Sequence, residues 1–380
     1  MASETPTRGL ENVVVASTHL SAIDGNAGNL SYVGYNIHDL AARAGFEEVA
    51  YLLWHGDLPL AAELGAFGAR LAAERALTAD ELALVRGIAA RGHGMDALRT
   101  LVSGLAQLDD QAAETSDEHV ERIGVRVLAK MPTLIAAWDR MRRGAAPVAP
   151  DPNLPHAANF LYMLRGTPPA PAEAHAFDCY MVLLAEHGLN ASTFAARVAI
   201  GAQADAYCAL VAAIGTLKGL LHGGANQKAM ETFLAIEQPD RAAEYIESLL
   251  AAHGRLMGVG HRIYKVEDPR VRHLRRQVQL LAAGGESRWQ AIADAVGRVV
   301  AEHPHFTRRQ LNPNVEFYSA PLLYTLGLPL DLFTAAFALS RVAGWVGHIR
   351  EQLADNRLIR PKADYSGPAP RGFVALNERG

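Results

Sequence analysis

Apolar residues recur at helical spacing along this chain, and that periodicity limits the folds it can adopt. Leu60, Leu64, Phe67 and Leu71 follow one another at steps of four, three and four residues, which places them on one face of a helix. Strand-like alternation is scarce, although residues 13–15 could begin a short N-terminal hairpin. The sequence therefore predicts an all-α fold with at most a short N-terminal β-hairpin, and not the alternating strands and helices of a dinucleotide-binding fold.

Two capping signals and one proline refine this prediction. The pairs Thr78/Glu81 and Thr115/Glu118 have the Thr-x-x-Glu spacing of a capping box, in which each side chain satisfies a free backbone N–H of the first helical turn. Pro132 lies inside the helix predicted after the second box. It should kink that helix, because proline deletes a backbone donor and clashes with the preceding turn.

Length and charge set further bounds. A chain of 380 residues is long enough for two or three domains. Its 36 basic and 40 acidic residues give a net charge of -4, which does not favour a dedicated nucleic-acid binder. We find no apolar run of the roughly 18–20 residues that a membrane span needs and no signal-peptide core in the first ten residues, so we expect a cytoplasmic protein. Cys179 and Cys208 lie in apolar helical patterns and are expected to be buried thiols.

Histidines followed by glycine are the most informative pattern. Five of the 15 histidines have this neighbour: His55, His93, His187, His222 and His253. For His55 and His253 a helix end is the better explanation, since a histidine in the last turn and a left-handed glycine after it both suit a helix C-terminus. His222 is followed by two glycines, which would let a ligand approach closely, so capping and substrate binding are both open there.

A basic stretch surrounds His261, which lies in the segment Gly-Val-Gly-His-Arg-Ile-Tyr-Lys at 258–265. The third glycine of a dinucleotide fingerprint is missing and no strand is predicted before it, so that function is not favoured. Between Arg255 and Arg276 basic residues are denser than elsewhere in the chain. They could form a solvated helix face or a site for phosphate or carboxylate, whose geometry the arginine fork matches.

Two charged residues interrupt apolar segments nearer the C-terminus. Glu316 lies between Val315 and Phe317, where desolvation would raise the pKa of its carboxyl towards the range of a general base; an ordinary exposed glutamate at a helix start is the alternative. Arg341 interrupts the apolar helix predicted over 333–349. Because a buried arginine needs a partner, an anionic substrate or an internal carboxylate is implied.

Several other chemistries lack their sequence signals. The chain contains no His-Glu-x-x-His zinc motif, no phosphate-binding loop and no Gly-x-Ser-x-Gly elbow. His303 and His305 are two residues apart and do not share a helix face. The residues alone thus indicate a helical protein with loop histidines, one acid and clustered arginines. This set suits proton transfer on an anionic substrate and does not name the reaction.

Five segments taken together resemble one family. They read Leu-His-Gly-Gly-Ala-Asn at 221–226, Gly-x-Gly-His-Arg-x-Tyr-Lys-x-x-Asp-Pro-Arg at 258–270, Asn-Val-Glu-Phe-Tyr-Ser at 314–319, Ser-Arg-x-x-Gly-Trp at 340–345 and Arg-Pro-x-Ala-x-Tyr at 360–365. In this order and spacing they closely resemble citrate synthases of the bacterial and archaeal type. The similarity extends over nearly the whole chain.

The resemblance implies an all-α homodimer. Residues 1–219 and 331–380 would form a large, dimer-forming domain, and 220–330 a smaller mobile domain that carries much of the active site. The implied activity is that of an acyltransferase of the tricarboxylic acid cycle, which condenses acetyl-CoA with oxaloacetate and hydrolyses citryl-CoA to citrate and CoA. No metal and no cofactor is implied, since acetyl-CoA is a substrate.

The resemblance also implies roles for individual residues. Glu316 would take a proton from the methyl group of the thioester, His222 would hydrogen-bond the developing enolate oxygen, and His261 would hydrogen-bond the oxaloacetate ketone and protonate the alkoxide. The predicted oxaloacetate ligands are His187, Arg270, Arg341 and Arg360, the last reaching into the site of the partner subunit. The predicted CoA-binding residues are Arg255, Met257, Gly258, Val259, Gly260 and Lys265.

One residue departs from the family pattern, because most members have Asp at the position of Glu316. The extra methylene would move the carboxylate by roughly an ångström on a fixed backbone, a displacement that can cost on the order of a hundredfold in rate, unless the backbone retreats. A 2-methylcitrate synthase acting on propionyl-CoA shares these motifs and is the main alternative. A citryl-CoA lyase module and a non-catalytic relative that binds oxaloacetate or CoA are the others.

Overall fold

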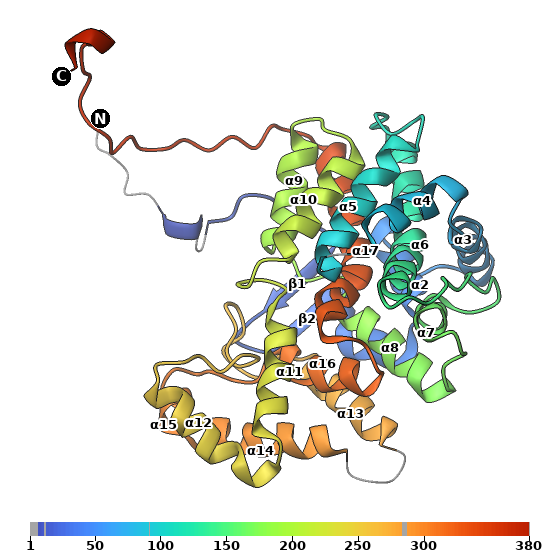
Figure 1. Ribbon diagram of the computed structural model, residues 1–380, viewed down its shortest axis with the longest axis vertical. Helices are drawn as coiled ribbons and strands as arrows, with labels where there is room; N and C mark the ends of the chain where they lie inside the picture. Colours follow the sequence, from blue (N-terminus) through green and yellow to red (C-terminus); the bar gives the residue numbers. More distant parts are fainter. Residues whose placement is uncertain (1–6, 11–12, 91, 283–286, 380) are drawn as a thin grey trace.

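A computed structural model describes residues 7–10, 13–90, 92–282 and 287–379, and most of these residues are helical (Figure 1). The α-helices are α1 Ile37–Arg43, α2 Phe46–His55, α3 Ala61–Glu74, α4 Ala79–Ile88, α5 Gly94–Gln107, α6 Asp117–Arg142, α7 His156–Arg165, α8 Pro171–Leu184, α9 Ala191–Gly201, α10 Ala206–Leu217, α11 Ala225–Ile236, α12 Ala242–Ala251, α13 Val271–Leu281, α14 Arg288–Glu302, α15 Pro304–Thr307, α16 Val315–Thr325 and α17 Phe333–Ala354. Short 3-10 helices are η1 Arg8–Leu10, η2 Pro239–Arg241, η3 Leu330–Leu332 and η4 Leu376–Glu378. The predicted all-α fold is confirmed.

The strands form one small antiparallel sheet near the N-terminus. Its order is β1 Ser21–Asp24, β2 Asn29–Tyr32 and β3 Tyr35–Asn36. The side chain of Asp24 closes the first turn by accepting hydrogen bonds from the backbone N–H groups of two turn residues at 3.0 and 2.9 Å. The expected hairpin is therefore a three-stranded sheet, and it begins later than predicted. Residues 13–15 form no strand, and Val14 is almost fully exposed.

The first capping signal is confirmed in both directions. Oγ1 of Thr78 accepts the N–H of Glu81 at 3.2 Å, and Oε2 of Glu81 accepts the N–H of Thr78 at 2.9 Å. The second was placed one residue early, because Ser116 caps α6 and Thr115 does not. Helix α6 continues through Pro132 without interruption, since almost every residue around the proline is buried and packing outweighs the lost hydrogen bond.

Two side-chain predictions were wrong. Cys179 is buried, but Cys208 is exposed near the start of α10, because it lies on the outer face of a helix that is apolar on both sides. His55 ends α2 before a left-handed Gly56, as predicted. His253 instead lies two residues beyond the end of α12 and itself takes the left-handed conformation, with φ of 55°, so it is not a last-turn residue.

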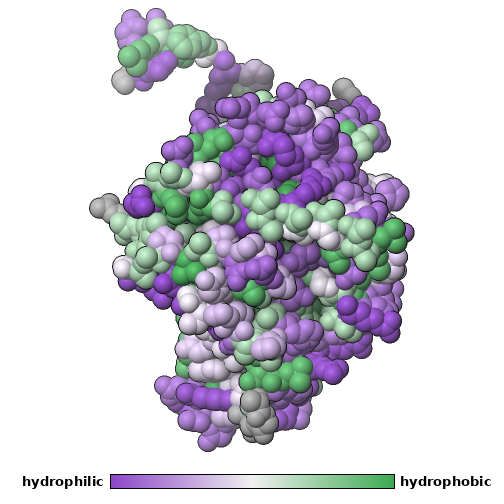
Figure 2. All heavy atoms as spheres, turned by 90° about the vertical axis from the view of Figure 1, so that its right-hand side faces the viewer, coloured by the Kyte–Doolittle hydropathy of each residue, from purple (hydrophilic) through white to green (hydrophobic). Residues whose placement is uncertain are grey.

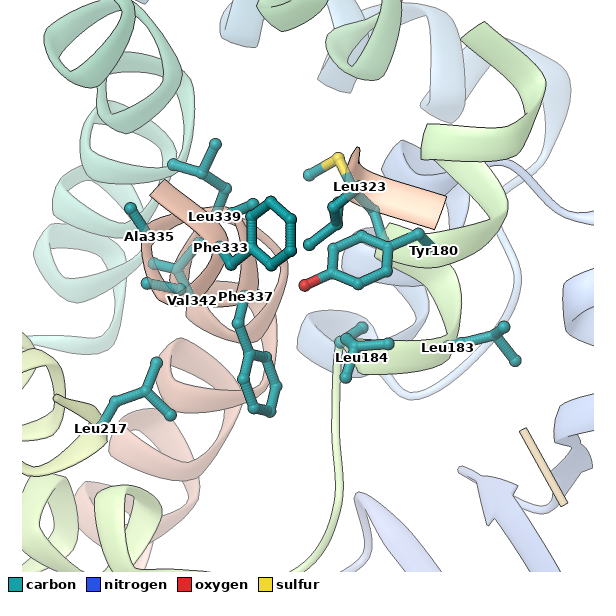
Figure 3. Close-up of a cluster of buried hydrophobic side chains, with 14 of the residues drawn as sticks. Tyr180, Leu183, Leu184, Leu217, Leu323, Phe333, Ala335, Phe337, Leu339 and Val342 are labelled. Atoms are coloured by element: carbon teal, nitrogen blue, oxygen red, sulfur yellow. The ribbon is translucent and has the colours of Figure 1, made fainter. Parts of the chain in front are cut away.

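Helix α17 is the central core element and packs against α2, α5, α6, α8, α9 and α10. Contrary to our expectation, the segment Leu330–Ala354 is long and apolar enough to span a membrane by length and composition, yet its most apolar window is entirely buried inside the protein. Figure 3 shows Phe333 and Phe337 of this helix facing Tyr180 of α8 and Leu323 of α16. The apolar character of α17 is thus explained by core packing.

Helices α11 to α16 gather in the lower part of the view in Figure 1. Within this group α11 and α13 pack on α16, and α12 packs on α14. Its contacts with the remainder of the chain include those of α13 and α16 with α8 and those of α11 with α17 and η3. It lies within 220–330, the stretch that we predicted as a small mobile domain; its mobility is still a prediction.

The chain after α17 leads away from the helices. Residues 355–379 are almost entirely exposed, and Figures 1 and 2 show their far end standing apart from the body. The apolar side chains of Leu358, Tyr365 and Phe373 are all more than half exposed. Elsewhere on the face shown in Figure 2, hydrophobic residues form patches among predominantly hydrophilic ones.

Candidate active site

His187 is held in place through the backbone that precedes it. Helix α8 ends at Leu184, and the side chains around it bind its last carbonyl groups. The hydroxyl of Tyr32 donates to the carbonyl of Leu183 at 3.1 Å, and Nε of Arg341 donates to the carbonyl of Leu184 at 2.7 Å. Residues of α17 and β2 thus hold this helix end, and His187, three residues beyond it, is 7% exposed.

Two aromatic rings from one segment, those of His261 and Tyr264, lie beside His187. Its Nε2 lies 3.1 Å from the hydroxyl of Tyr264, and its ring centroid is 5.4 Å from that of His261. Nδ1 of His261 accepts the backbone N–H groups of Ile263 at 3.0 Å and Tyr264 at 3.1 Å. The ring hydrogen of His261 therefore sits on Nε2, where it can be donated to a ligand.

Burial keeps these imidazoles neutral. It is the main cause that lowers the pKa of His261 to about 4, with the charge of Arg270 second. Burial, and then the charges of Arg270 and His261, hold the pKa of His187 well below its usual value. Both rings are therefore uncharged hydrogen-bonding groups at neutral pH.

His222 lies in the turn between α10 and α11, and its orientation is set by α9. Nε2 of His222 lies 3.3 Å from the backbone N–H of Ser192 and 2.8 Å from its hydroxyl, and Nε1 of Trp345 donates to the same hydroxyl at 3.1 Å. A backbone N–H can only donate, so Nε2 accepts and the ring hydrogen sits on Nδ1. Burial, with a second contribution from Arg341, lowers the pKa of His222 to about 4. His222 is thus a neutral donor through Nδ1.

Glu316 is positioned by the loop that precedes His261. Asn314 caps α16 by accepting the N–H of Glu316 at 3.1 Å, and its side-chain amide donates to the carbonyl of Gly260 at 2.8 Å. The N–H of Asn314 donates to the carbonyl of Gly258 at 3.0 Å. Gly258 has φ of +81°, and a Cβ there would lie 3.2 Å from Cα of Phe317. Only glycine fits this close approach, which ties the His261 loop to the start of α16.

Two buried guanidinium groups differ in their partners. Arg270 and Arg341 are each 2% exposed. Arg270 binds Asp268 through two hydrogen bonds, at 2.9 and 2.6 Å. Arg341 forms no ion pair within the described ranges and stacks over the ring of Phe337 at 4.8 Å. Since burying an unpaired charge is costly, Arg341 is the cation that an added anion would stabilise most.

The electrostatic effects that these groups exert on one another indicate that they lie near one another. Burial raises the pKa of Glu316, and Arg270 and Arg341 both act against this rise. The same two arginines lower the pKa of His187, and Arg341 lowers that of His222. Because such effects weaken with distance, the predicted base, the imidazoles and the two arginines lie close together.

The remaining predicted residues differ in how exposed they are and in whether they lie near the site. Arg360 is exposed in the C-terminal segment and is not brought to the site of its own chain. Arg255 and Lys265 are exposed and Met257 is half-buried, whereas the side chain of Val259 is buried. In the loop predicted to bind CoA, only some side chains are thus free to touch a ligand.

Sequence reasoning missed four residues that shape the site. Tyr264 and Asp268 lie within a segment quoted above, but they received no role. Ser192 is 30 residues from His222. Burial raises the pKa of the Tyr180 hydroxyl, and the charge of Glu316 adds to this rise. The one local signal is Asn190, which caps the helix that contains Ser192. No sequence pattern could connect Ser192 with His222 or Tyr180 with Glu316, because each pair is far apart in the chain. In the part of the chain that the structure describes, no three His, Cys, Asp or Glu side chains are placed to hold a metal ion.

Fold and site together define a helical protein that places neutral imidazole donors and one half-buried carboxyl near buried guanidinium groups, an arrangement that suits an anionic substrate. The family model for the citrate synthase C-terminal domain matches residues 9–362. The chain belongs to the citrate synthase family and is an enzyme of the acyltransferase type.

Known relatives cover essentially the whole chain. A citrate synthase of Haloferax volcanii is 46% identical over 98% of each chain, and 2-methylcitrate synthase 2 of Corynebacterium glutamicum is 38% identical over 100% of each. The solved ternary complex of carboxymethyl coenzyme A and oxaloacetate with citrate synthase from Thermoplasma acidophilum has a TM-score of 0.93 at 29% identity, over 99% of this chain and 100% of that one.

Proposed function

We propose that the protein condenses acetyl-CoA with oxaloacetate through an enolate and hydrolyses citryl-CoA to citrate and CoA. The observation that carries this proposal is the convergence of Glu316, His222 and His261 around two buried arginines. The Haloferax volcanii relative is named a citrate synthase, and the Thermoplasma acidophilum enzyme was solved with oxaloacetate and a CoA derivative.

The first step is removal of a proton from the acetyl methyl group. Glu316 takes the proton, and the electron pair of the broken C–H bond moves towards the thioester oxygen. His222 donates its Nδ1–H to that oxygen. A preorganised donor aimed at developing charge is worth about 3–4 kcal/mol of barrier, and the raised pKa of Glu316 suits a general base.

The second step forms the carbon–carbon bond. Arg270 and Arg341 hold the carboxylates of oxaloacetate, and Nε2–H of His261 polarises its ketone. The enolate carbon attacks the ketone carbon, and the proton of His261 passes to the resulting alkoxide. The proton that Glu316 took from the methyl group returns through water to the ring of His261. Water then adds to the thioester of citryl-CoA, and CoA leaves as the thiol.

A 2-methylcitrate synthase is the second candidate, favoured by the relative in Corynebacterium glutamicum. The two acyl groups differ by one methylene, which a pocket distinguishes by about 10- to 200-fold. The deciding experiment follows thiol release with oxaloacetate and either acetyl-CoA or propionyl-CoA at matched concentration. Faster release from acetyl-CoA supports our proposal, and faster release from propionyl-CoA supports the second candidate. Oxaloacetate binding without release from either would identify a non-catalytic relative.

We also propose the assembly in which this reaction occurs. The chain acts as a homodimer in the cytoplasm, without a metal or cofactor, and residues 220–330 close over the substrates. Arg360 enters the site of the partner subunit. Its exposure in a segment that leads away from its own chain's site supports this last point.

A further inference from the structure

A line of buried polar side chains runs from α17 to the backbone beside His187. His348 in α17 and Glu186, the residue before His187, are both fully buried, and Nε2 of His348 lies 3.1 Å from Oε1 of Glu186. On the other side of the ring, Nη1 of Arg197 lies 3.1 Å from Nδ1. None of these three residues has a part in the reaction proposed above.

The guanidinium of Arg197 fixes the direction of these hydrogen bonds. A guanidinium only donates, so Nδ1 of His348 accepts and the ring hydrogen sits on Nε2, which donates it to Glu186. Oε2 of Glu351 is 3.7 Å from Nδ1, beyond hydrogen-bonding distance, and binds Arg197 at 2.5 Å instead. The imidazole of His348 therefore bridges a buried carboxylate and a buried guanidinium.

The carboxylate of Glu186 connects this line to both neighbours of His187. Its Oε1 also accepts the hydroxyl of Ser21 at 2.9 Å, and that hydroxyl oxygen accepts the N–H of Gly188 at 3.1 Å. The residues before and after His187 in the chain are thus bonded into one network. The imidazole of His187 itself faces Tyr264 and is left free of the network.

We propose that His348 and Glu186 are positioning residues for His187, fixing where its imidazole meets oxaloacetate. Without the donor at His348, the carboxylate of Glu186 would keep Ser21 as its remaining donor within the described ranges. A buried charge that loses its partner is strongly unfavourable, so the backbone of 186–188 would shift to find another. The inference rests on the proposed function, which gives His187 its role in oxaloacetate binding.

The effect should be specific to one substrate. Within the described ranges, none of the six residues predicted to bind CoA forms a hydrogen bond with the residues of this network or with His187. Among the described residues, their loop meets His187 only through Tyr264, at 3.1 Å, and the ring of His261. A shift of the His187 backbone should therefore weaken oxaloacetate binding and leave acyl-CoA binding nearly unchanged. A general loss of packing would affect both substrates.

The test compares His348→Leu with His348→Gln in the full chain. The Gln amide nitrogen is as many bonds from Cα as Nε2 and can donate to Glu186, whereas Leu cannot. We expect His348→Leu to raise both the Kd and the KM for oxaloacetate by roughly 10- to 100-fold, the range for a misplaced binding group. The KM for acetyl-CoA should stay within about twofold, and His348→Gln should restore most of the loss.

Lys130→Met is the matched control. Lys130 pairs with the fully buried Glu81 at 3.0 Å, so this variant also removes one partner of a buried carboxylate. Within the described ranges the partners of Lys130 are Ala76 and Glu81, and neither belongs to the network around Glu186. This variant should lower thermal stability and leave both KM values unchanged. Equal shifts in both KM values for His348→Leu, or the same kinetics for Leu and Gln, would overturn the proposal.

A second pair covers the case in which His348→Leu does not fold. His348→Asn places its amide near Nδ1, out of reach of Glu186, and should weaken oxaloacetate binding where His348→Gln does not. Identical oxaloacetate affinities for Asn and Gln would also overturn the proposal. Absence of thiol release by the unsubstituted enzyme would refute the proposed function and not this inference. The two failures can be told apart, because calorimetry measures oxaloacetate binding to each variant without any turnover.

Discussion

At the scale of single residues, the two histidines His222 and His261 differ in which ring nitrogen carries the hydrogen. His222 accepts at Nε2 and donates at Nδ1, whereas His261 accepts at Nδ1 and donates at Nε2. In each case backbone N–H groups impose the choice, because they cannot reverse their role. Two histidines are thus neutral donors of fixed direction, and in the reaction that we propose Glu316 is the base.

Glu316→Gln should abolish turnover while leaving oxaloacetate affinity nearly unchanged. The amide occupies the same volume but cannot take a proton, and general-base catalysis contributes typically 10²- to 10⁴-fold. Thiol release measures the first expectation, and calorimetric titration with oxaloacetate measures the second. Glu302→Gln, an exposed change at the end of α14, is the control. Wild-type turnover in Glu316→Gln would remove our base assignment.

At the scale of whole elements, α17 combines core packing with support of the site. It buries apolar side chains along its length and also carries Arg341 and Trp345, which hold α8 and Ser192. Gly344 lets this helix approach the chain after α8, because its N–H donates to the carbonyl of Ala185 at 3.1 Å. The close approach depends on the missing side chain.

The same substitution should therefore have opposite effects in two helices. A Cβ at Gly344 would lie 2.5 Å from the carbonyl oxygen of Ala185 and closer still to Glu186, whereas one at Gly65 in α3 meets nothing within 4 Å. Gly344→Ala should lower the free energy of unfolding by about 1–3 kcal/mol, and Gly65→Ala should raise it by about 0.5–1 kcal/mol. Urea unfolding of both variants gives the signs; a stabilised Gly344→Ala would contradict the packing described here.

These elements also show how far the sequence could predict the structure. The Thr78/Glu81 cap was predictable because both partners lie within one turn, and the five segments identified the family and its candidate residues. The bond between Ser192 and His222 was not, because it depends on how α9 packs beside the turn before α11. Likewise, exposure of Cys208 follows from which face of α10 meets its neighbours, and an apolar pattern on both faces cannot decide that.

At the scale of the whole molecule, one predicted site residue lies outside the site. Arg360 follows the last α-helix by six residues and is exposed. The other predicted catalytic and oxaloacetate-binding side chains lie near Arg270 and Arg341, whose charges act on their pKa values. Because the segment leads away from its own chain's site, we expect it to reach into a second copy of the chain. We therefore expect each active site to be shared.

Mixing two inactive variants tests the shared site. Co-expressed Arg360→Ala and Glu316→Gln chains would form mixed dimers in which one site has both an intact Glu316 and the partner's Arg360. Random pairing predicts about a quarter of wild-type thiol release. Each variant alone should be nearly inactive. If the mixture shows only the sum of the two separate activities, Arg360 acts within its own chain or not at all.

The exposed segment after α17 has one more consequence, for how this enzyme could be switched off. Arg357, Arg360 and Lys362 lie there without cover, and irregular exposed chain is where proteases cut most readily. A trypsin-like cleavage after Arg357 would leave every helix of the core in place and still remove Arg360, which we propose enters the neighbouring subunit. We therefore expect trimming at Arg357 to abolish activity under conditions far too mild to unfold the protein.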